Sequence, residues 1–260
     1  MMKLSIDTWV FCENWSLDKL IEVCRSAGYA GAEFRAEDGQ KHGVELEATA
    51  TQRQEIRRKL EDGYIEASCI STSQCLHQFD EKKRKSAIDR AKRFVDLAAD
   101  IDCRAIRVFG DGDRIGDTDS RQAICSTGDA LHEVAEHAAD SDVMVAFEMH
   151  GQFNLWKYAV GVVEHADHPN AALNYNSDTR DLVAGSVGVT YSRVRDHIEH
   201  VHLHDLESDF PYVELFRLLQ EDGYEGFTSL EVDYRGGDPE KVMALYGELW
   251  RAQVALAAGW

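Results

Sequence analysis

Short runs of strand type alternate with longer amphipathic segments over almost the whole chain. The strand-type runs occupy residues 4–11, 30–35, 66–72, 104–110, 143–148, 171–176, 200–205 and 228–233. The segments between them place apolar residues at i, i+3, i+4 and i+7, the period of a helix with one buried face. Strands separated by helices of ten or more residues pair in parallel, and eight such units are the number that closes a barrel. The sequence therefore predicts an α/β fold, a single (β/α)8 TIM barrel domain over residues 1–260.

An open, doubly wound parallel sheet is the alternative arrangement of the same elements. Folds of that kind usually carry a glycine-rich phosphate loop after the first strand. Here the first run is followed by CENWSLDKL, which contains no G-x-G-x-x-G. The longest loop-like stretch, residues 110–120, is better explained as a βα loop at the catalytic face than as a linker between domains. The closed barrel is therefore the favoured fold.

Glycines mark the expected ends of several helices. Gly28, Gly63 and Gly223 each stand where a C-terminal cap is expected, and a tyrosine follows each of them. The repeated order of helix, glycine, tyrosine and strand indicates one βα unit that is used several times.

The composition excludes several classes of function. The chain has 28 basic and 47 acidic residues, a formal net charge of -19, so it repels phosphate backbones and anionic membranes. We therefore expect neither a nucleic-acid partner nor membrane association. The six cysteines are scattered without a C-x-x-C pair, which is typical of buried apolar residues in a reducing compartment. Residues 1–11 are too short and too polar for a signal peptide, so the expected location is the cytoplasm.

The last four predicted strands carry polar residues on one face. Side chains alternate between the two faces of a strand, and in these strands the other face is apolar and must pack against the helices. The polar face therefore looks into the barrel. Its most evenly spaced members are Glu148, Asn176, His202 and Glu231, separated by 28, 26 and 29 residues. Each interval is about one βα unit, which predicts similar heights at the C-terminal mouth, where barrel enzymes place their sites.

The burial of these four groups requires compensation. A carboxylate or an imidazole inside a barrel costs several kcal/mol unless a partner or a cation offsets the cost. Two carboxylates, one imidazole and one amide oxygen form a ligand set that suits manganese, magnesium or cobalt. Any one of the residues alone would be explained by a salt bridge or by a satisfied core histidine. The four together, in phase, favour a divalent metal site with open positions for a substrate.

Three segments around these residues resemble the xylose isomerase-like TIM barrel superfamily. The family's fifth-strand E-N-H-G segment is similar to VAFEMHGQF (145–153), its H-V-H-L-K-D segment to IEHVHLHDL (198–206), and its G-Y-x-G-x-x-x-x-E segment to GYEGFTSLEVD (223–233). The superfamily includes sugar isomerases, ketose 3-epimerases, inosose dehydratases and DNA repair enzymes of the endonuclease IV type. The resemblance extends over nearly the whole chain.

The resemblance implies a divalent metal cofactor, with manganese expected first and magnesium, cobalt or zinc as alternatives. In epimerase-type members a Glu, an Asp, a His and a Glu hold the metal, and the two glutamates are the acid–base pair. Carried over, the ligands are Glu148, Asn176, His202 and Glu231, with Glu148 and Glu231 as the catalytic pair. Further strand-end candidates, expected mainly in substrate binding, are Glu33, His77, Arg107, His150, Asp178 and His204, followed by Asp205 and Arg235.

The chain departs from the family pattern at three positions. Asn176 stands where the family usually has Asp, which keeps a carbonyl oxygen but lowers the ligand charge, and Asp178 is the alternative ligand. His204 replaces the usual lysine, so a fixed cation becomes a group that titrates near neutrality. Met149 replaces the fifth-strand Asn, while His150 is retained.

The leading functional hypothesis is a metal-dependent isomerase or epimerase that acts on a sugar, ketose or polyol by proton transfer next to a carbonyl. A lyase of the inosose dehydratase kind uses the same parts and is the alternative among enzymes. A barrel that binds a sugar or metabolite without turnover is the alternative outside enzymes, and Asn176 supports it. The net charge disfavours an endonuclease. A homo-oligomer is an open alternative, because the last predicted helix, from residue 239, either caps its own barrel or meets a neighbouring chain.

Overall fold

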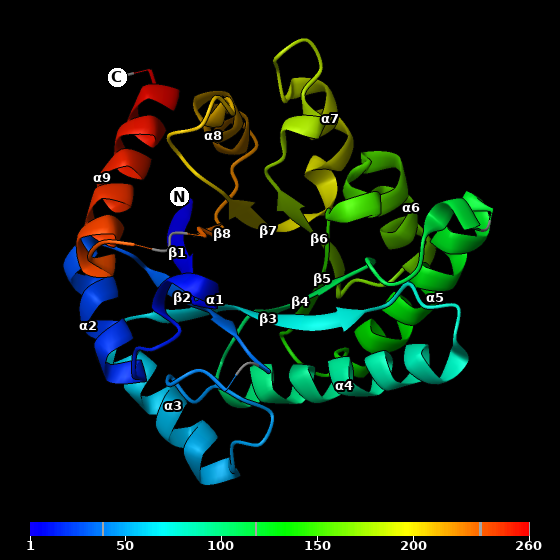
Figure 1. Ribbon diagram of the computed structural model, residues 1–260, viewed down its shortest axis with the longest axis horizontal. Helices are drawn as coiled ribbons and strands as arrows, with labels where there is room; N and C mark the ends of the chain where they lie inside the picture. The colour runs from blue at the N-terminus through cyan, green and yellow to red at the C-terminus, as the bar shows by residue number, and fades with distance from the viewer. Residues whose placement is uncertain (38, 118, 234–235, 260) are drawn as a thin grey trace.

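A computed structural model of the chain describes residues 1–37, 39–117, 119–233 and 236–259. Eight parallel strands follow one another around a closed barrel in chain order, and the helices surround it (Figure 1). The (β/α)8 barrel predicted from the alternating pattern is confirmed. The strands are β1 (Lys3–Asp7), β2 (Gly31–Arg35), β3 (Glu66–Cys75), β4 (Ala105–Phe109), β5 (Met144–Glu148), β6 (Ala171–Asn176), β7 (Ile198–Leu203) and β8 (Phe227–Leu230).

Helices lie between successive strands and cover the outside of the barrel (Figure 1). In the described parts of the chain no helix has both the length and the apolar character needed to cross a membrane. The α-helices are α1 (Trp9–Cys12), α2 (Leu17–Ala27), α3 (Ala50–Gly63), α4 (Glu81–Asp100), α5 (Ser120–His137), α6 (Trp156–Ala166), α7 (Gly188–Val194), α8 (Tyr212–Glu221) and α9 (Pro239–Ala257). Short 3-10 helices are η1 (Ile115–Asp117), η2 (Gly151–Asn154), η3 (Thr179–Asp181) and η4 (Arg195–His197).

The first and the last of the predicted strands end three or more residues earlier than their sequences indicate. The first run continues to residue 11 in its apolar pattern, but the strand stops at Asp7, whose carboxylate accepts a hydrogen bond from the backbone N–H of Trp9 at 2.8 Å. An aspartate that bonds its own backbone two residues on favours a turn over a strand. The last run stops at Leu230, so Glu231 follows β8, although its backbone N–H still donates to the carbonyl of Leu203 at 2.8 Å.

The glycines at the helix ends behave in two ways. Gly28 and Gly223 adopt the left-handed conformation, with φ of 76° and 70°, as a C-terminal cap requires. Gly63 does not, because it is the last residue of α3 and Tyr64 takes the left-handed position with φ 55°. A Cβ on Gly63 would lie 2.4 Å from Cγ2 of Ile21 in α2. Gly63 is therefore needed for the close approach of two helices, and its predicted role as a cap was wrong.

The barrel wall separates an apolar layer from a polar interior. The outward side chains of the last four strands are fully or almost fully buried against the helices, as for Phe147, Tyr175 and Leu203. The inward side chains toward the ends of these strands, such as Glu148, Asn176 and His202, are polar and equally buried. In register across neighbouring strands, Asn176 of β6 lies opposite His202 of β7. The alternation in the sequence thus places polar groups inside the barrel. The partners that offset the cost of burying these groups decide what the site can do.

Candidate metal centre

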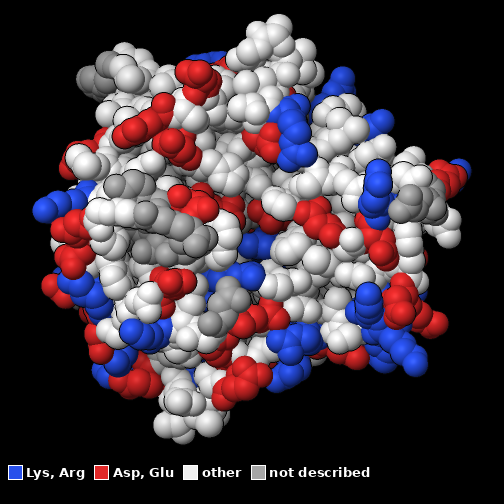
Figure 2. Space-filling view, in the orientation of Figure 1, with Lys and Arg blue, Asp and Glu red and all other residues white. Residues whose placement is uncertain are grey.

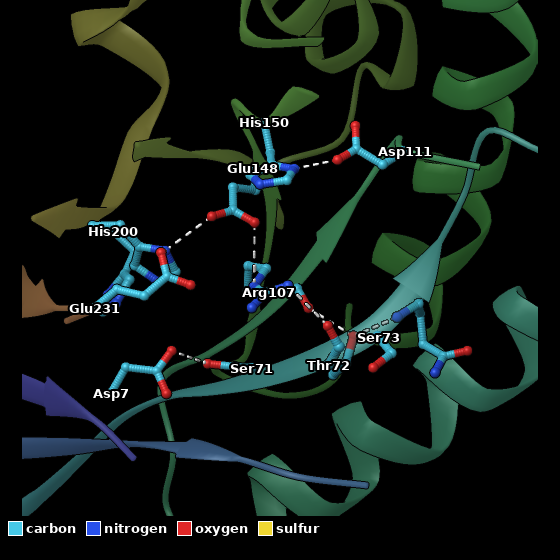
Figure 3. Close-up of polar contacts among 12 residues, drawn as sticks. Asp7, Ser71, Thr72, Ser73, Arg107, Asp111, Glu148, His150, His200 and Glu231 are labelled. Atoms are coloured by element: carbon cyan, nitrogen blue, oxygen red, sulfur yellow. Dashed lines mark hydrogen bonds and ion pairs between the residues drawn. The ribbon is translucent and has the colours of Figure 1, made fainter. Parts of the chain in front are cut away.

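Three inward side chains from the ends of β5, β7 and β8 converge on one position. Nδ1 of His202 lies 2.9 Å from Oε1 of Glu148 and 3.2 Å from Oε2 of Glu231. One ligand atom from each of these residues lies within 4.8 Å of the others. Figure 3 shows Glu231 and Arg107 approaching Glu148 from different sides of the barrel. The two carboxylates and the imidazole, far apart in the sequence, form a cluster that is able to hold a metal ion.

Asn176 supplies a further oxygen beside this cluster. It is paired with His202 in the register of β6 and β7, and it is buried. Within the described parts of the chain, its Oδ1 has no hydrogen-bond partner. A buried acceptor without a partner costs about 1–3 kcal/mol. A carbonyl oxygen left without a donor next to two carboxylates and an imidazole fits a cation ligand.

The electrostatics of the interior also fit a cation. Burial alone would lower the pKa of His202, but the carboxylates of Glu33 and Glu231 and the hydrogen bond to Glu148 raise it well above its usual range. A protonated imidazole therefore compensates the carboxylates when no metal is bound. A metal ligand must offer a free lone pair, so metal binding at Nδ1 would displace a proton from this cluster.

Arg107 is the fixed positive charge of the interior. Its Nη1 donates to the carbonyl of Thr72 at 2.9 Å, and its Nε lies 3.4 Å from Oε2 of Glu148. Burial opposes the ionisation of Glu148, but Arg107 and His202 lower its pKa to about 2. The guanidinium is itself buried, so Arg107 acts on Glu148 directly and is not open to the mouth of the barrel.

Glu33 and His77 do not lie where a substrate would reach them. Glu33 has no exposed surface and accepts hydrogen bonds from His200 and His202 inside the barrel. His77 is also fully buried, and its Nδ1 lies 3.2 Å from the hydroxyl of Thr127 in α5, outside the barrel wall. Both side chains are enclosed by protein in this structure, so their expected role in substrate binding stays a prediction without a direct contact to support it.

Asp178 is not brought into the ligand cluster. Its carboxylate accepts hydrogen bonds from Nε and Nη2 of Arg180 at 2.6–3.0 Å, and it also accepts the backbone N–H of Arg180. Among the described residues, the groups that could hold a metal do not include it. The alternative in which Asp178 replaces Asn176 as a ligand is therefore not supported, since Arg180 already uses its oxygens.

Two histidines stand at the rim. The side chain of His150 is half exposed and pairs with Asp111, which raises its pKa above the usual value (Figure 3). His204 follows β7, is 43% exposed at its side chain and contacts the backbone carbonyl of Glu231 through Nδ1 at 3.2 Å. Both imidazoles are accessible, as a substrate-binding role requires.

Asp205, a further strand-end candidate, forms its hydrogen bonds outside the cluster. Asp205 accepts a hydrogen bond from the hydroxyl of Tyr246 in α9 at 2.8 Å and another from the backbone of Glu207. Its carboxylate thus fixes a surface loop to α9. Arg235 lies outside the described residues.

Sequence reasoning missed a second polar layer below the cluster. Ser71 of β3 lies between two carboxylates, with its hydroxyl 3.0 Å from Oδ2 of Asp7 and 2.6 Å from Oε1 of Glu33. Burial and the charge of Glu33 raise the pKa of Asp7 to about 8. The raised pKa favours the protonated form of Asp7, and the hydroxyl of Ser71 bridges the carboxyl groups of Asp7 and Glu33. The sequence signal for this layer was the polar residue Asp7 within an apolar strand. The sequence around Ser71 gave no comparable signal.

The sequence matches the family model described as xylose isomerase-like TIM barrel over residues 21–251. The chain belongs to this family. Among curated proteins no match to the sequence is found.

Solved structures with a similar fold include an L-ribulose 3-epimerase, at 17% identity and a TM-score of 0.82 over 99% of this chain and 96% of that one. A 3-keto-D-glucoside 4-epimerase from E. coli is 14% identical, with a TM-score of 0.79 over the full length of both chains. The probable 3-DHS dehydratase of Bacillus anthracis is 16% identical, with a TM-score of 0.77 over 96% of this chain and 99% of that one. At these identities the likeness shows a shared fold.

Proposed function

We propose that the protein is a divalent-metal-dependent isomerase or epimerase of a sugar, ketose or polyol, with Glu148 and Glu231 as its acid–base pair. The observation that carries the proposal is the convergence of both carboxylates on Nδ1 of His202, at 2.9 and 3.2 Å, at the C-terminal ends of the strands. Two carboxylates at one centre are able to remove a carbon-bound proton on one face and to return a proton on the other.

The metal would be held by Glu148, Asn176, His202 and Glu231, with manganese as the first expectation and magnesium, cobalt or zinc as alternatives. The ligand oxygens and the single imidazole suit these ions. Such an ion would polarise a carbonyl and the adjacent hydroxyl, and would so acidify the hydrogen on the carbon that bears the hydroxyl. The lack of a hydrogen-bond partner for Oδ1 of Asn176 among the described residues supports its inclusion in the ligand set.

The chain's own residues would handle the proton. Glu148 is a carboxylate at neutral pH, because Arg107 and His202 hold its pKa down to about 2 against the effect of burial. Its power as a base therefore depends on position rather than on a raised pKa. Glu231 directly follows β8. This strand lies three strands around the barrel from β5, whose end carries Glu148. A substrate lying between them would present different atoms to the two carboxylates.

A small sugar or polyol is the proposed substrate. Half-exposed His150 and His204 offer hydrogen bonds to hydroxyl groups at the rim. Both epimerases named above carry sugar names, which supports the same class here. Six free cysteines support a reducing compartment such as the cytoplasm.

A lyase that eliminates water is the second candidate. The fold similarity to a probable dehydratase, with a TM-score of 0.77, supports a lyase as the alternative function. The same carboxylate pair would serve, because elimination next to a carbonyl also begins with removal of a carbon-bound proton. The products separate the two reactions, since an epimerase conserves the mass of its substrate and a dehydratase loses water.

Metal analysis of the purified protein tests the proposal. We expect close to one equivalent of divalent metal per chain and, after chelation, a rise in Tm of several degrees when manganese is added well above its Kd. A panel of ketoses and inososes, followed by mass and by sugar analysis, then separates epimerisation from dehydration. No bound metal together with no thermal shift would refute the catalytic centre and leave a barrel that only binds its ligand.

A further inference from the structure

Glu33 connects β2 to β7 through the interior of the barrel. Its Oε1 lies 2.9 Å from Nε2 of His202, and its Oε2 lies 2.8 Å from Nε2 of His200. The two strands are not neighbours, since β1 and β8 lie between them on one side and β3–β6 on the other. The contact joins residues 169 positions apart in the chain. It is therefore a product of barrel closure rather than of strand pairing.

The two nitrogens of the His202 ring face different partners. Nδ1 faces Glu148 and Glu231, where the proposed metal would bind, while Nε2 faces Glu33 alone. A neutral imidazole that offers the lone pair of Nδ1 must carry its hydrogen on Nε2. That N–H needs an acceptor, and Glu33 is in place to accept it.

The carboxylate of Glu33 is itself held on both oxygens. His200 bonds one oxygen, and the hydroxyl of Ser71 donates to the other at 2.6 Å. Glu33, His200 and His202 are all essentially unexposed, so bulk water cannot take over the role of the carboxylate. A fixed acceptor behind a ligand imidazole sets both the ring orientation and the tautomer.

We propose that Glu33 is the positioning residue of the metal centre: it accepts the Nε2–H of His202 and so directs the Nδ1 lone pair at the position between Glu148 and Glu231. The proposal rests on the proposed metal centre but not on the reaction or the substrate. Glu33 would not touch the metal or the substrate. It would act through His202 alone.

Substitution Glu33→Gln tests this role through metal affinity. Glutamine keeps the size of the side chain but offers one acceptor oxygen where Glu33 meets two imidazoles. We expect the Kd for manganese, measured from free Mn²⁺ by electron paramagnetic resonance, to rise about 10- to 100-fold. Asp181→Asn is the matched control, since it also replaces a buried carboxyl group with an amide, but one that bonds Asn154 instead of a proposed ligand. Its manganese affinity should equal that of the wild type.

A measurement on the unmodified protein keeps the proposal testable if Glu33→Gln does not fold. In ¹⁵N-histidine-labelled protein with bound Zn²⁺, the His202 signals, assigned by their loss in His202→Asn, should show metal at Nδ1 and a slowly exchanging hydrogen on Nε2. Metal at Nε2, or a hydrogen on Nδ1, would overturn the proposal.

The outcomes separate this inference from the proposed function. If the wild type binds no metal, the metal centre fails and the positioning role fails with it. If the wild type binds manganese and Glu33→Gln binds it equally well, only the positioning role is wrong. Two equivalents of metal in the wild type, one of which is lost in Glu33→Gln, would make Glu33 a ligand and would also overturn the proposal.

Discussion

Arg107 and Glu148 form an ion pair inside the barrel, with Nε 3.4 Å from Oε2 and less than a tenth of either side chain exposed. The guanidinium comes from β4 and the carboxylate from the neighbouring strand β5. Because neither group reaches bulk water, each depends on the other for compensation. We expect the pair to link the stability of the barrel to the occupancy of the proposed metal centre.

Removal of the buried cation should therefore destabilise the metal-free protein strongly. We expect Arg107→Leu to lower the free energy of unfolding by about 3–5 kcal/mol in the presence of a chelator, because carboxylates are left without their partner. With manganese bound, the loss should be smaller, since the metal compensates the same charges. Urea unfolding with and without manganese measures the difference. Equal losses in both conditions would contradict the charge coupling.

The acid–base pair should be needed for turnover but not for folding. Glu148→Gln and Glu231→Gln keep the size of each side chain and remove its ability to accept a proton. We expect each to lower kcat roughly 100- to 10,000-fold on the substrate found in the panel. Circular dichroism and manganese content, measured on the same samples, distinguish lost chemistry from lost metal. Full activity in either variant would remove that residue from the mechanism.

An added ligand charge should strengthen metal binding. Asn176→Asp puts a carboxylate where an unpartnered amide oxygen now lies. We expect the Kd for manganese to fall about tenfold, because ligand charge tunes the affinity of oxygen sites. The same variant should be less stable than the wild type in chelator, since it adds one more uncompensated carboxylate. Asp178→Asn is the control: its oxygens already bind Arg180, so manganese affinity should not change.

Asp181 should make stability fall as the pH rises. Burial first, and then the charge of Asp178, raise the pKa of Asp181 from 3.8 to about 7 in the folded protein. Between about pH 4 and 7 the unfolded chain has therefore lost this proton while the folded protein still holds it, so deprotonation favours unfolding.

The variant Asp181→Asn should remove this pH dependence. It keeps an acceptor for Asn154, whose Nδ2 donates to Oδ1 of Asp181 at 2.9 Å. Relative to the wild type, it should gain stability progressively from pH 4 to 7, by up to about 4 kcal/mol for a shift of this size. Urea unfolding at several pH values, with exposed Asp140→Asn as the reference, measures the gain. A constant difference between variant and wild type would show that Asp181 keeps an ordinary pKa.

Local periodicity was sufficient to predict the barrel and the polar row in its last four strands. Alternation with period two assigns Glu148, Asn176 and His202 to one face, because neighbouring side chains of a strand must point in opposite directions. The apolar opposite face fixes which side is inside. Glu231 was also found in this way, although it lies one residue beyond the end of β8.

Only the tertiary structure decided which polar groups meet. The sequence could not join Glu33 to His202, or Asp7 to Ser71, because those contacts are made between strands that are not neighbours. Nor could it show that, among the described residues, Oδ1 of Asn176 has no hydrogen-bond partner. The hydrophobic pattern of a sequence is local information, because it reflects the geometry of one strand or one helix. Contacts across the barrel depend on how eight strands close and how they are staggered, which no single segment encodes.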